Sequence, residues 1–162
     1  MKNLILCRHA KSSWKYDVDD VFRPLNARGM LQAPLMTDGC TLEPDQVLCS
    51  PAVRAWSTAV CYFKLLHWDY ATLQIEPRIH EASCATLMTI LKGIEERINT
   101  LYIFGHNPSL NSLIDLLDCT NQHHPNLVTS GRVRLKLEIE AWQELRQSCG
   151  TIEEWTIPAD LT

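Results

Sequence analysis

The chain has 162 residues, 46% of them hydrophobic and 21% charged, which predicts one globular domain over residues 1–162 rather than two. Its formal net charge of −4 gives no broad basic surface for nucleic acid or anionic lipid, so any anion site must be local. No apolar run has the length of a membrane span, the opening segment is too short for a signal peptide, and the seven cysteines form no Cys-x-x-Cys pair. We therefore expect a cytoplasmic protein with neither nucleic-acid nor membrane partners.

The first predicted strand is the apolar run over residues 4–7, and it ends where Arg8 and His9 open a polar loop. A helix is expected next, over about residues 26–36. Pro34 should kink or shorten this helix, because proline lacks the backbone N–H that an inner helical turn requires. The apolar residues expected on this helix are Met30, Leu31 and Leu35.

A short second strand is predicted over residues 46–49, directly before a second helix. Ser50 is the expected N-cap of that helix and Pro51 the expected first helical residue, since serine caps and proline at the first position are common helix starts. The spacing of the following apolar residues predicts that the buried face of this helix consists of Val53, Trp56, Val60, Phe63 and Leu66.

The middle of the chain repeats the alternation of strand and helix. Residues 73–75 are predicted to form a strand, a helix is expected to begin near Ser83, and residues 100–104 have the composition of a buried strand. We expect the helix to carry its apolar residues at Leu87, Ile90, Leu91, Ile94 and Ile98.

Asn107 and Pro108 repeat the cap-then-proline signal and predict a fourth helix. Residues 120–126 are polar and should form a loop. The regular alternation of apolar and polar residues over 133–139 predicts a half-buried or edge strand, and residues 151–157 are the last strand candidate. The apolar face of the fourth helix is expected to be Leu110, Leu113, Ile114 and Leu117.

Alternating strands and helices indicate an α/β fold with a largely parallel central sheet, helices on its faces and an antiparallel strand at its edge. Ligands of such sheets bind beyond the carboxyl ends of the strands, where this reading places His9, Ser50 and His106 together. Two helices should also begin there, and their free backbone N–H groups favour an anion. Phosphate is the natural candidate.

The residues at these strand ends suit phosphoryl transfer. A neutral histidine such as His9 can attack phosphorus through one ring nitrogen when a hydrogen bond holds the other nitrogen. Arg8 and Arg54 would bind the phosphoryl oxygens with planar, permanently charged groups, and a protonated His106 would add another donor. Arg54 in the first turn of a helix opposes the helix dipole, a penalty that an adjacent anion would relieve.

Glu81 is the best candidate for the acid that protonates an alcohol leaving group, because it falls between the third strand and the helix near Ser83. A carboxylate that complements the helix dipole is the competing structural explanation. We expect His80 to be a surface residue without a partner, and we expect no metal at His123 and His124, which no Cys or carboxylate cluster joins.

The order and spacing of these residues resemble the histidine phosphatase superfamily, which has the phosphoglycerate mutase-like fold. The short length and two further segments, Arg8 to Trp14 and Arg23 to Gly29, look most like the SixA-type phosphohistidine phosphatases. The resemblance spans about residues 2 to 158. It is carried by Arg8-His9-Ala10, Ser50-Pro51-Ala52-Val53-Arg54-Ala55 with Thr58-Ala59, Glu81, and Gly105-His106-Asn107-Pro108.

The resemblance implies a three-layer α/β/α sandwich, a covalent phosphohistidine on His9, and no metal or other cofactor. It implies that Arg8, Arg54 and His106 hold the phosphate. Arg23 and Asn107 are the expected substrate contacts.

We expect a phosphatase acting on phosphohistidine in a protein, because few residues separate Arg54, Glu81 and His106 and so little chain is left for a lid. A small-molecule phosphatase acting on a sugar or nucleotide phosphate is the main alternative. A non-catalytic phosphate-binding adaptor domain is the alternative from another class. We expect a monomer, since charged residues alternate along 133–139 and oppose pairing of that strand between copies.

Overall fold

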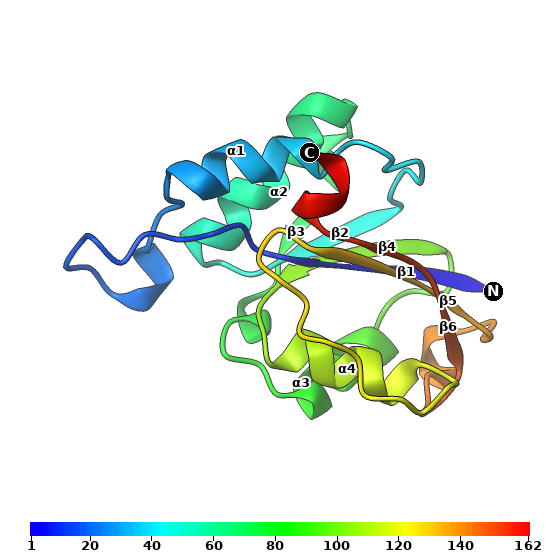
Figure 1. Ribbon diagram of the computed structural model, residues 1–162. Coiled ribbons are helices and arrows are strands. Elements are labelled where there is room, and N and C mark those ends of the chain that lie inside the picture. The colour runs from blue at the N-terminus through cyan, green and yellow to red at the C-terminus, as the bar shows by residue number, and fades with distance from the viewer.

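The centre of the protein is a six-stranded sheet in the order β3-β2-β4-β1-β5-β6 (Figure 1). The computed structural model describes all residues, 1–162. Strands β1 to β4 are parallel to their neighbours within that group, while β5 is antiparallel to both β1 and β6. The strands are β1 (Lys2–Arg8), β2 (Gln46–Cys49), β3 (Leu73–Ile75), β4 (Thr100–Gly105), β5 (Arg132–Leu137) and β6 (Gly150–Thr156).

The predicted fold class, a largely parallel sheet between helical layers, is confirmed. The antiparallel strand β5 lies inside the sheet, however, and β6 is the edge strand. Val133, Leu135 and Leu137 of β5 belong to the hydrophobic core. Of the two alternatives predicted for residues 133–139, a half-buried strand or an edge strand, the first therefore agrees with the structure and the second was wrong. Both sides of β5 are hydrogen-bonded, one to β1 and the other to β6.

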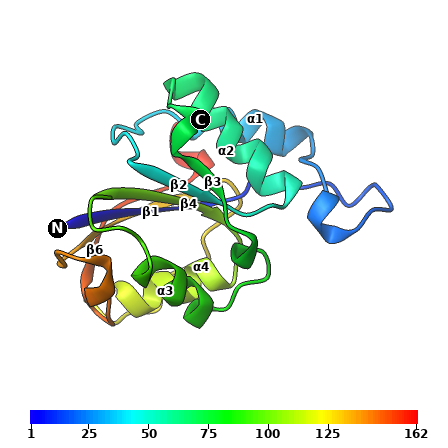
Figure 2. The ribbon, with the colours of Figure 1, turned by 180° about the vertical axis from the view of Figure 1, so that it is seen from behind.

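Two pairs of helices cover the two faces of the sheet (Figures 1 and 2). Helices α1 (Ala27–Leu35) and α2 (Val53–Leu66) lie on one face, and α3 (Cys84–Lys92) and α4 (Ser109–Leu117) lie on the other. None of these helices is long and apolar enough to cross a membrane. Short 3-10 turns occupy Asp20–Phe22, Tyr70–Thr72, Pro77–Ile79, Trp142–Glu144 and Pro158–Leu161.

The alternation of side chains along a strand divides the core between the two helical layers. In β1, Leu4 and Leu6 join a cluster of 22 buried residues on the side of α3 and α4. Ile5 and Cys7 join a cluster of 12 buried residues on the side of α1 and α2. An uninterrupted apolar run is what a strand buried on both faces needs, so β1 is held firmly in the middle of the molecule.

Helix α1 begins as predicted, because the Asn26 side chain accepts a hydrogen bond from the Gly29 N–H at 2.9 Å. Its buried residues, however, are Gly29 and Ala33. The small residues let α1 approach its neighbours closely, and the helix ends one residue after Pro34. The three apolar residues expected on this helix are exposed, namely Met30, Leu31 and Leu35.

Helix α2 begins at Val53 with Ala52 at the cap position, so the prediction of Ser50 as N-cap and Pro51 as first helical residue was wrong. The predicted buried face was also wrong for Trp56, which is 41% exposed. The face that packs on the sheet is built around small residues, which allow a short distance between helix and sheet. The buried residues of α2 are Arg54, Ala55, Thr58, Ala59, Tyr62 and Phe63.

The two helices on the other face start close to their predicted positions. Ser83 caps α3 by accepting a hydrogen bond from the Thr86 N–H at 3.1 Å. The helix ends before Gly93, so Ile94 and Ile98 lie beyond it even though Ile98 is buried. Helix α4 begins at Ser109, one residue after Pro108.

Candidate active site

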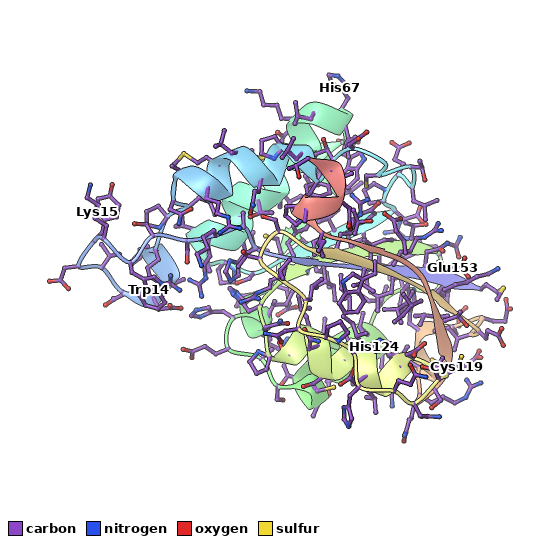
Figure 3. All side chains as sticks on the ribbon, viewed as in Figure 1. Trp14, Lys15, His67, Cys119, His124 and Glu153 are labelled. Atoms are coloured by element: carbon purple, nitrogen blue, oxygen red, sulfur yellow. The ribbon has the colours of Figure 1, made fainter.

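The carboxyl ends of β1, β2 and β4 meet at a pocket of about 320 Å³. All seven residues predicted from the sequence as catalytic or substrate-binding line this pocket. A loop that carries Trp14 and Lys15 projects from the same side of the molecule (Figure 3). The lining consists of Arg8, His9, Lys11, Ser12, Trp14, Arg23, Arg54, His80, Glu81, His106, Asn107 and Thr129.

His9 follows directly after β1 and is held at both its backbone and its ring. Its N–H donates to the Gly105 carbonyl at 3.1 Å, which ties it to the end of β4. Its Nδ1 lies 2.7 Å from the Ala10 carbonyl oxygen, which can only accept, so Nδ1 carries the proton. The lone pair of the neutral ring is therefore on Nε2.

The His9 ring is buried among cationic groups. Burial lowers the pKa of His9 to about 4, and the positive charges of Arg54 and Arg8 act in the same direction. The ring is thus neutral near pH 7 in the free protein. A neutral imidazole with a fixed tautomer is the form that attacks an electrophile.

His106 follows β4, and its ring centroid lies 5.1 Å from that of His9. Its Nε2 lies 2.7 Å from the Ser50 Oγ at the end of β2, so this hydrogen bond orients the ring. Ser50 therefore serves the pocket instead of capping α2. Burial lowers the pKa of His106 to about 3, with His9 and Arg54 contributing. His106 offers the N–H of a neutral ring unless a bound anion supplies negative charge.

Arg8 is fixed by the loop before β5. Its Nη1 donates to the Leu127 carbonyl at 2.8 Å. The Asn107 side chain donates to the same carbonyl at 3.1 Å and to the Asn111 side chain at 2.8 Å. The amide of Asn107 is thus engaged in holding this loop, and its role as a substrate contact stays a prediction.

The segment after His9 is anchored to α2 by a single side chain. The Thr58 hydroxyl accepts the Ala10 N–H at 2.9 Å and donates to the Arg54 carbonyl at 2.7 Å. Both bonds are buried. Thr58 therefore fixes the position of the nucleophile candidate relative to the first turn of α2, which explains why a threonine stands four residues after Arg54.

The anion beside Arg54 is the carboxylate of Asp20, a residue that the sequence reasoning missed. Arg54 donates from Nη1 to the Asp20 carbonyl at 2.8 Å and from Nη2 to the Asp20 carboxylate at 2.9 Å. Arg23 donates to the other carboxylate oxygen at 3.1 Å. Hydrogen bonds from His80, Arg54 and Arg23 hold the pKa of Asp20 well below its usual range.

Arg23 forms the outer wall of the pocket. Its guanidinium stacks over the Trp14 ring, 3.6 Å from the ring centroid, and it also donates to the Ser12 hydroxyl. The Asp20 carboxylate also accepts a hydrogen bond from the Arg23 guanidinium. The projecting loop is therefore fastened to the pocket through Arg23.

Glu81 and His80 occupy the opposite rim, between β3 and α3. Glu81 is exposed, has a backbone φ of 59°, and forms no hydrogen bond. His80 contradicts the prediction of an unpartnered surface residue, because its Nε2 lies 3.0 Å from the Asp20 carboxylate. No sequence pattern joins two residues 60 positions apart, so only the folded arrangement reveals this pair.

The pocket carries four permanent or near-permanent cations and one carboxylate in its lining, although the whole chain has a net charge of −4. The cations are Arg8, Lys11, Arg23 and Arg54, and the carboxylate is Glu81. Such a pocket favours an anion, and His9 is among the residues that line it. No group of three or more His, Cys, Asp or Glu side chains is arranged to hold a metal ion.

Residues 4–112 of the chain match the sequence profile of the histidine phosphatase superfamily (branch 1). Two proteins of Mycobacterium tuberculosis, one each from strains CDC 1551 and H37Rv and both described only as uncharacterized, are 31% identical to the chain over 114 residues. These matches cover 68% of this chain and 68% of each relative.

Solved structures give the same fold. The protein histidine phosphatase SixA complexed with tungstate superposes with a TM-score of 0.83 at 21% identity, over 99% of both chains. A putative phosphohistidine phosphatase SixA from Agrobacterium tumefaciens gives 0.81 at 20% identity, over 97% of this chain and 98% of its own. A mycobacterial glucosyl-3-phosphoglycerate phosphatase gives 0.69 at 13% identity, over 96% and 98%.

Proposed function

The chain belongs to the histidine phosphatase superfamily, and on this premise we propose that it is a phosphatase whose substrate is phosphohistidine on a protein. The reaction passes through a phosphoryl group carried by His9. The observation that carries this proposal is the hydrogen bond from His9 Nδ1 to the Ala10 carbonyl, which leaves Nε2 as the nucleophile inside a cationic pocket.

The proposed reaction has two steps. In the first, the lone pair of His9 Nε2 forms a bond to phosphorus while the bond from phosphorus to the leaving nitrogen breaks. Arg8 and Arg54 bind the oxygens over which the negative charge spreads. In the second, water attacks the phosphoryl group on His9, releasing inorganic phosphate and restoring the neutral ring.

The accessibility of the pocket supports a protein substrate. Between Arg54 and His106, the connections outside α2, β3, α3 and β4 are short and cover residues 67–72, 76–83 and 93–99. The stretch from Glu76 to Ser83 is the connection that reaches the pocket rim, and it is too short to fold over the site. A histidine displayed on the surface of a folded protein can therefore approach His9.

The test is phosphate release from a histidine-phosphorylated protein in EDTA by the wild type, His9→Ala and His123→Ala. His123 is a matched control because its side chain is 98% exposed and lies outside the pocket. We expect release by the wild type and His123→Ala, and a loss of at least about 10³-fold in His9→Ala. Quenching in alkali should trap the phosphoryl group on His9.

Other outcomes would redirect the proposal. Release from sugar or nucleotide phosphates but not from phosphohistidine would make the protein a small-molecule phosphatase. Binding of phosphate without turnover of any substrate would make it an adaptor domain. Equal release by wild type and His9→Ala would remove His9 from the reaction.

A further inference from the structure

His80 and Asp20 form a hydrogen-bonded pair at the rim of the pocket that the reaction described above does not use. The pair joins the 3-10 turn Asp20–Phe22 to the connection between β3 and α3, with 3.0 Å between His80 Nε2 and the Asp20 carboxylate. The His80 side chain is 20% exposed and lines the same pocket as His9. The His80 ring is thus oriented by Asp20 and lies at the same pocket as His9.

The hydrogen bond determines which nitrogen of His80 is available. Asp20 is ionised, because it accepts hydrogen bonds from two arginines as well, and an ionised carboxylate can only accept. His80 Nε2 therefore carries a proton. Its Nδ1 has no hydrogen-bond partner in the protein, so it is the atom that can exchange a proton with a group in the pocket.

The charged groups around His80 come from three elements. The Asp20 carboxylate contacts the ring directly. The neutral His106 ring, at the end of β4, lies edge-on with 5.6 Å between centroids. Arg54 and Arg23 also form ion pairs with the Asp20 carboxylate, so two guanidinium groups share this carboxylate with His80. Glu81 is its neighbour in the chain.

We propose that His80, oriented by Asp20, is the general acid that protonates the leaving atom when His9 attacks phosphorus. The proposal rests on the proposed function in that it takes His9 as the nucleophile. As the His9 nitrogen bonds to phosphorus, the bond to the leaving oxygen or nitrogen breaks, and that atom takes the proton from His80 Nδ1. His80, now neutral, accepts a proton from the water that later attacks phospho-His9.

Glu81, the acid expected from the sequence, is less well placed for this role. Its side chain is exposed and makes no hydrogen bond that would fix its orientation, whereas the His80 ring is fixed by Asp20 and packed beside His106. Proton transfer requires a donor held within hydrogen-bond distance of the leaving atom. An oriented ring satisfies this requirement better than a free carboxylate.

The experiment compares an ester with a poor leaving group, glycerol 2-phosphate, and one with a good leaving group, 2,4-dinitrophenyl phosphate. The variants are His80→Gln, Asp20→Asn and Glu81→Gln. Glutamine at position 80 keeps an amide N–H for Asp20 but has no proton to transfer. We expect His80→Gln to lower kcat/KM for the alkyl ester about 10²-fold more than for the aryl ester.

A further result is expected if Asp20 orients the acid. Asp20→Asn should also lower kcat/KM for the alkyl ester more than for the aryl ester, because the His80 ring loses the carboxylate that holds it in place.

A merely structural role would lower both activities by the same factor in His80→Gln, and that result would overturn the proposal. A loss confined to the alkyl ester in Glu81→Gln instead of His80→Gln would assign the acid to Glu81. Failure on phosphohistidine with turnover of both esters would retire only the proposed substrate. If the wild type turns over phosphohistidine but neither ester, the leaving imidazole becomes the test, and equal turnover of phosphohistidine by wild type and His80→Gln would overturn the proposal.

Discussion

At the scale of single residues, the Asp20 carboxylate offsets part of the positive charge beside the pocket before any substrate arrives. Arg54 stands in the first turn of α2, where a cation opposes the helix dipole, and the Asp20 carboxylate offsets this penalty. The same carboxylate engages Arg23 and His80. The Asp20 side chain therefore fixes Arg54, Arg23 and His80 relative to one another.

Arg54→Lys should impair catalysis, because an ammonium group cannot make the two parallel contacts with Asp20 that the guanidinium makes. We expect kcat/KM to fall about 10²-fold, which corresponds to about 2.7 kcal/mol of transition-state stabilisation. Steady-state kinetics measure this. Arg97→Lys is the control, since Arg97 is exposed and pairs only with Glu95. A fall below threefold in Arg54→Lys would show that the paired contacts of Arg54 with Asp20 contribute little to catalysis.

The low pKa of His9 predicts the protonation state of the free protein. Burial lowers this pKa to about 4, so the ring should be neutral above about pH 5 and gain a proton as pH falls through 4. The unfolded state takes up that proton near pH 6.5, so the free energy of unfolding should decrease as pH falls from 6.5 to 4. Histidine NMR signals, with His9 assigned by comparison with His9→Ala, measure the titration. A midpoint at or above 6.5 would contradict the prediction.

The sequence was sufficient to predict that the residues following the strand ends line one pocket. His9, Arg54 and His106 stand just after buried apolar runs, and parallel strands bring such positions to one edge of the sheet. Asp20 and His80 lie in irregular segments, and no periodic pattern indicates where such segments meet. Their pairing depends on the path of a loop, which the sequence pattern does not specify.

At the scale of elements, the close approach of α1 to the pocket depends on a glycine. A Cβ atom at Gly29 would lie 2.2 Å from the Lys11 carbonyl oxygen, which is backbone and cannot rotate away. Lys11 and Ser12 line the pocket, and Ser12 contacts Arg23. The packing of α1 and the shape of the pocket wall are therefore coupled.

Gly29→Ala should lower the free energy of unfolding by about 1–3 kcal/mol despite the better helix propensity of alanine. It should also lower kcat/KM, because the wall at Lys11 must move. Gly93→Ala is the matched control, since its Cβ would lie 3.4 Å from the nearest atom. Urea unfolding and kinetics on both variants test this. An unchanged or raised stability in Gly29→Ala would contradict the prediction.

The elements themselves were predictable in number and order, while their faces and ends were less so. Met30 and Leu31 fit an apolar helix face but are exposed, because the close contact of α1 selects Gly29 and Ala33 for burial. The apolar spacing through Ile98 suggested a longer α3, yet Gly93 ends the helix. Tertiary packing decides which helix residues are buried and where a helix ends, and a local sequence pattern carries no information about that packing.

At the scale of the whole molecule, a cationic pocket is set in an acidic protein. The net charge of −4 disfavours general anion binding, so phosphate should bind only at the pocket. Ligand that binds the folded state alone stabilises it by about 2.7 kcal/mol at 100 times its Kd. This corresponds to a rise in Tm of about 5–10 °C for a chain of this size.

Thermal unfolding with inorganic phosphate measures this effect, and sodium chloride at the same ionic strength is the control. Arg54→Lys should reduce the phosphate-dependent rise, because it weakens the binding site and leaves the rest of the surface unchanged. An equal rise with chloride, or an equal rise in the variant, would show that phosphate acts on the surface in general.

The position of β1 between β4 and β5 has a consequence for how this protein can diverge. The groups proposed to hold phosphorus, Arg8, Arg54 and His106, lie on β1, on α2 and just after β4, where most substitutions disturb the core. The proposed acid His80, and Asp20 that orients it, stand on connections outside the sheet, where sequence change is tolerated far better. Selection can therefore exchange one phosphorylated compound for another by altering connections, while the inherited phosphoryl-transfer machinery stays in place.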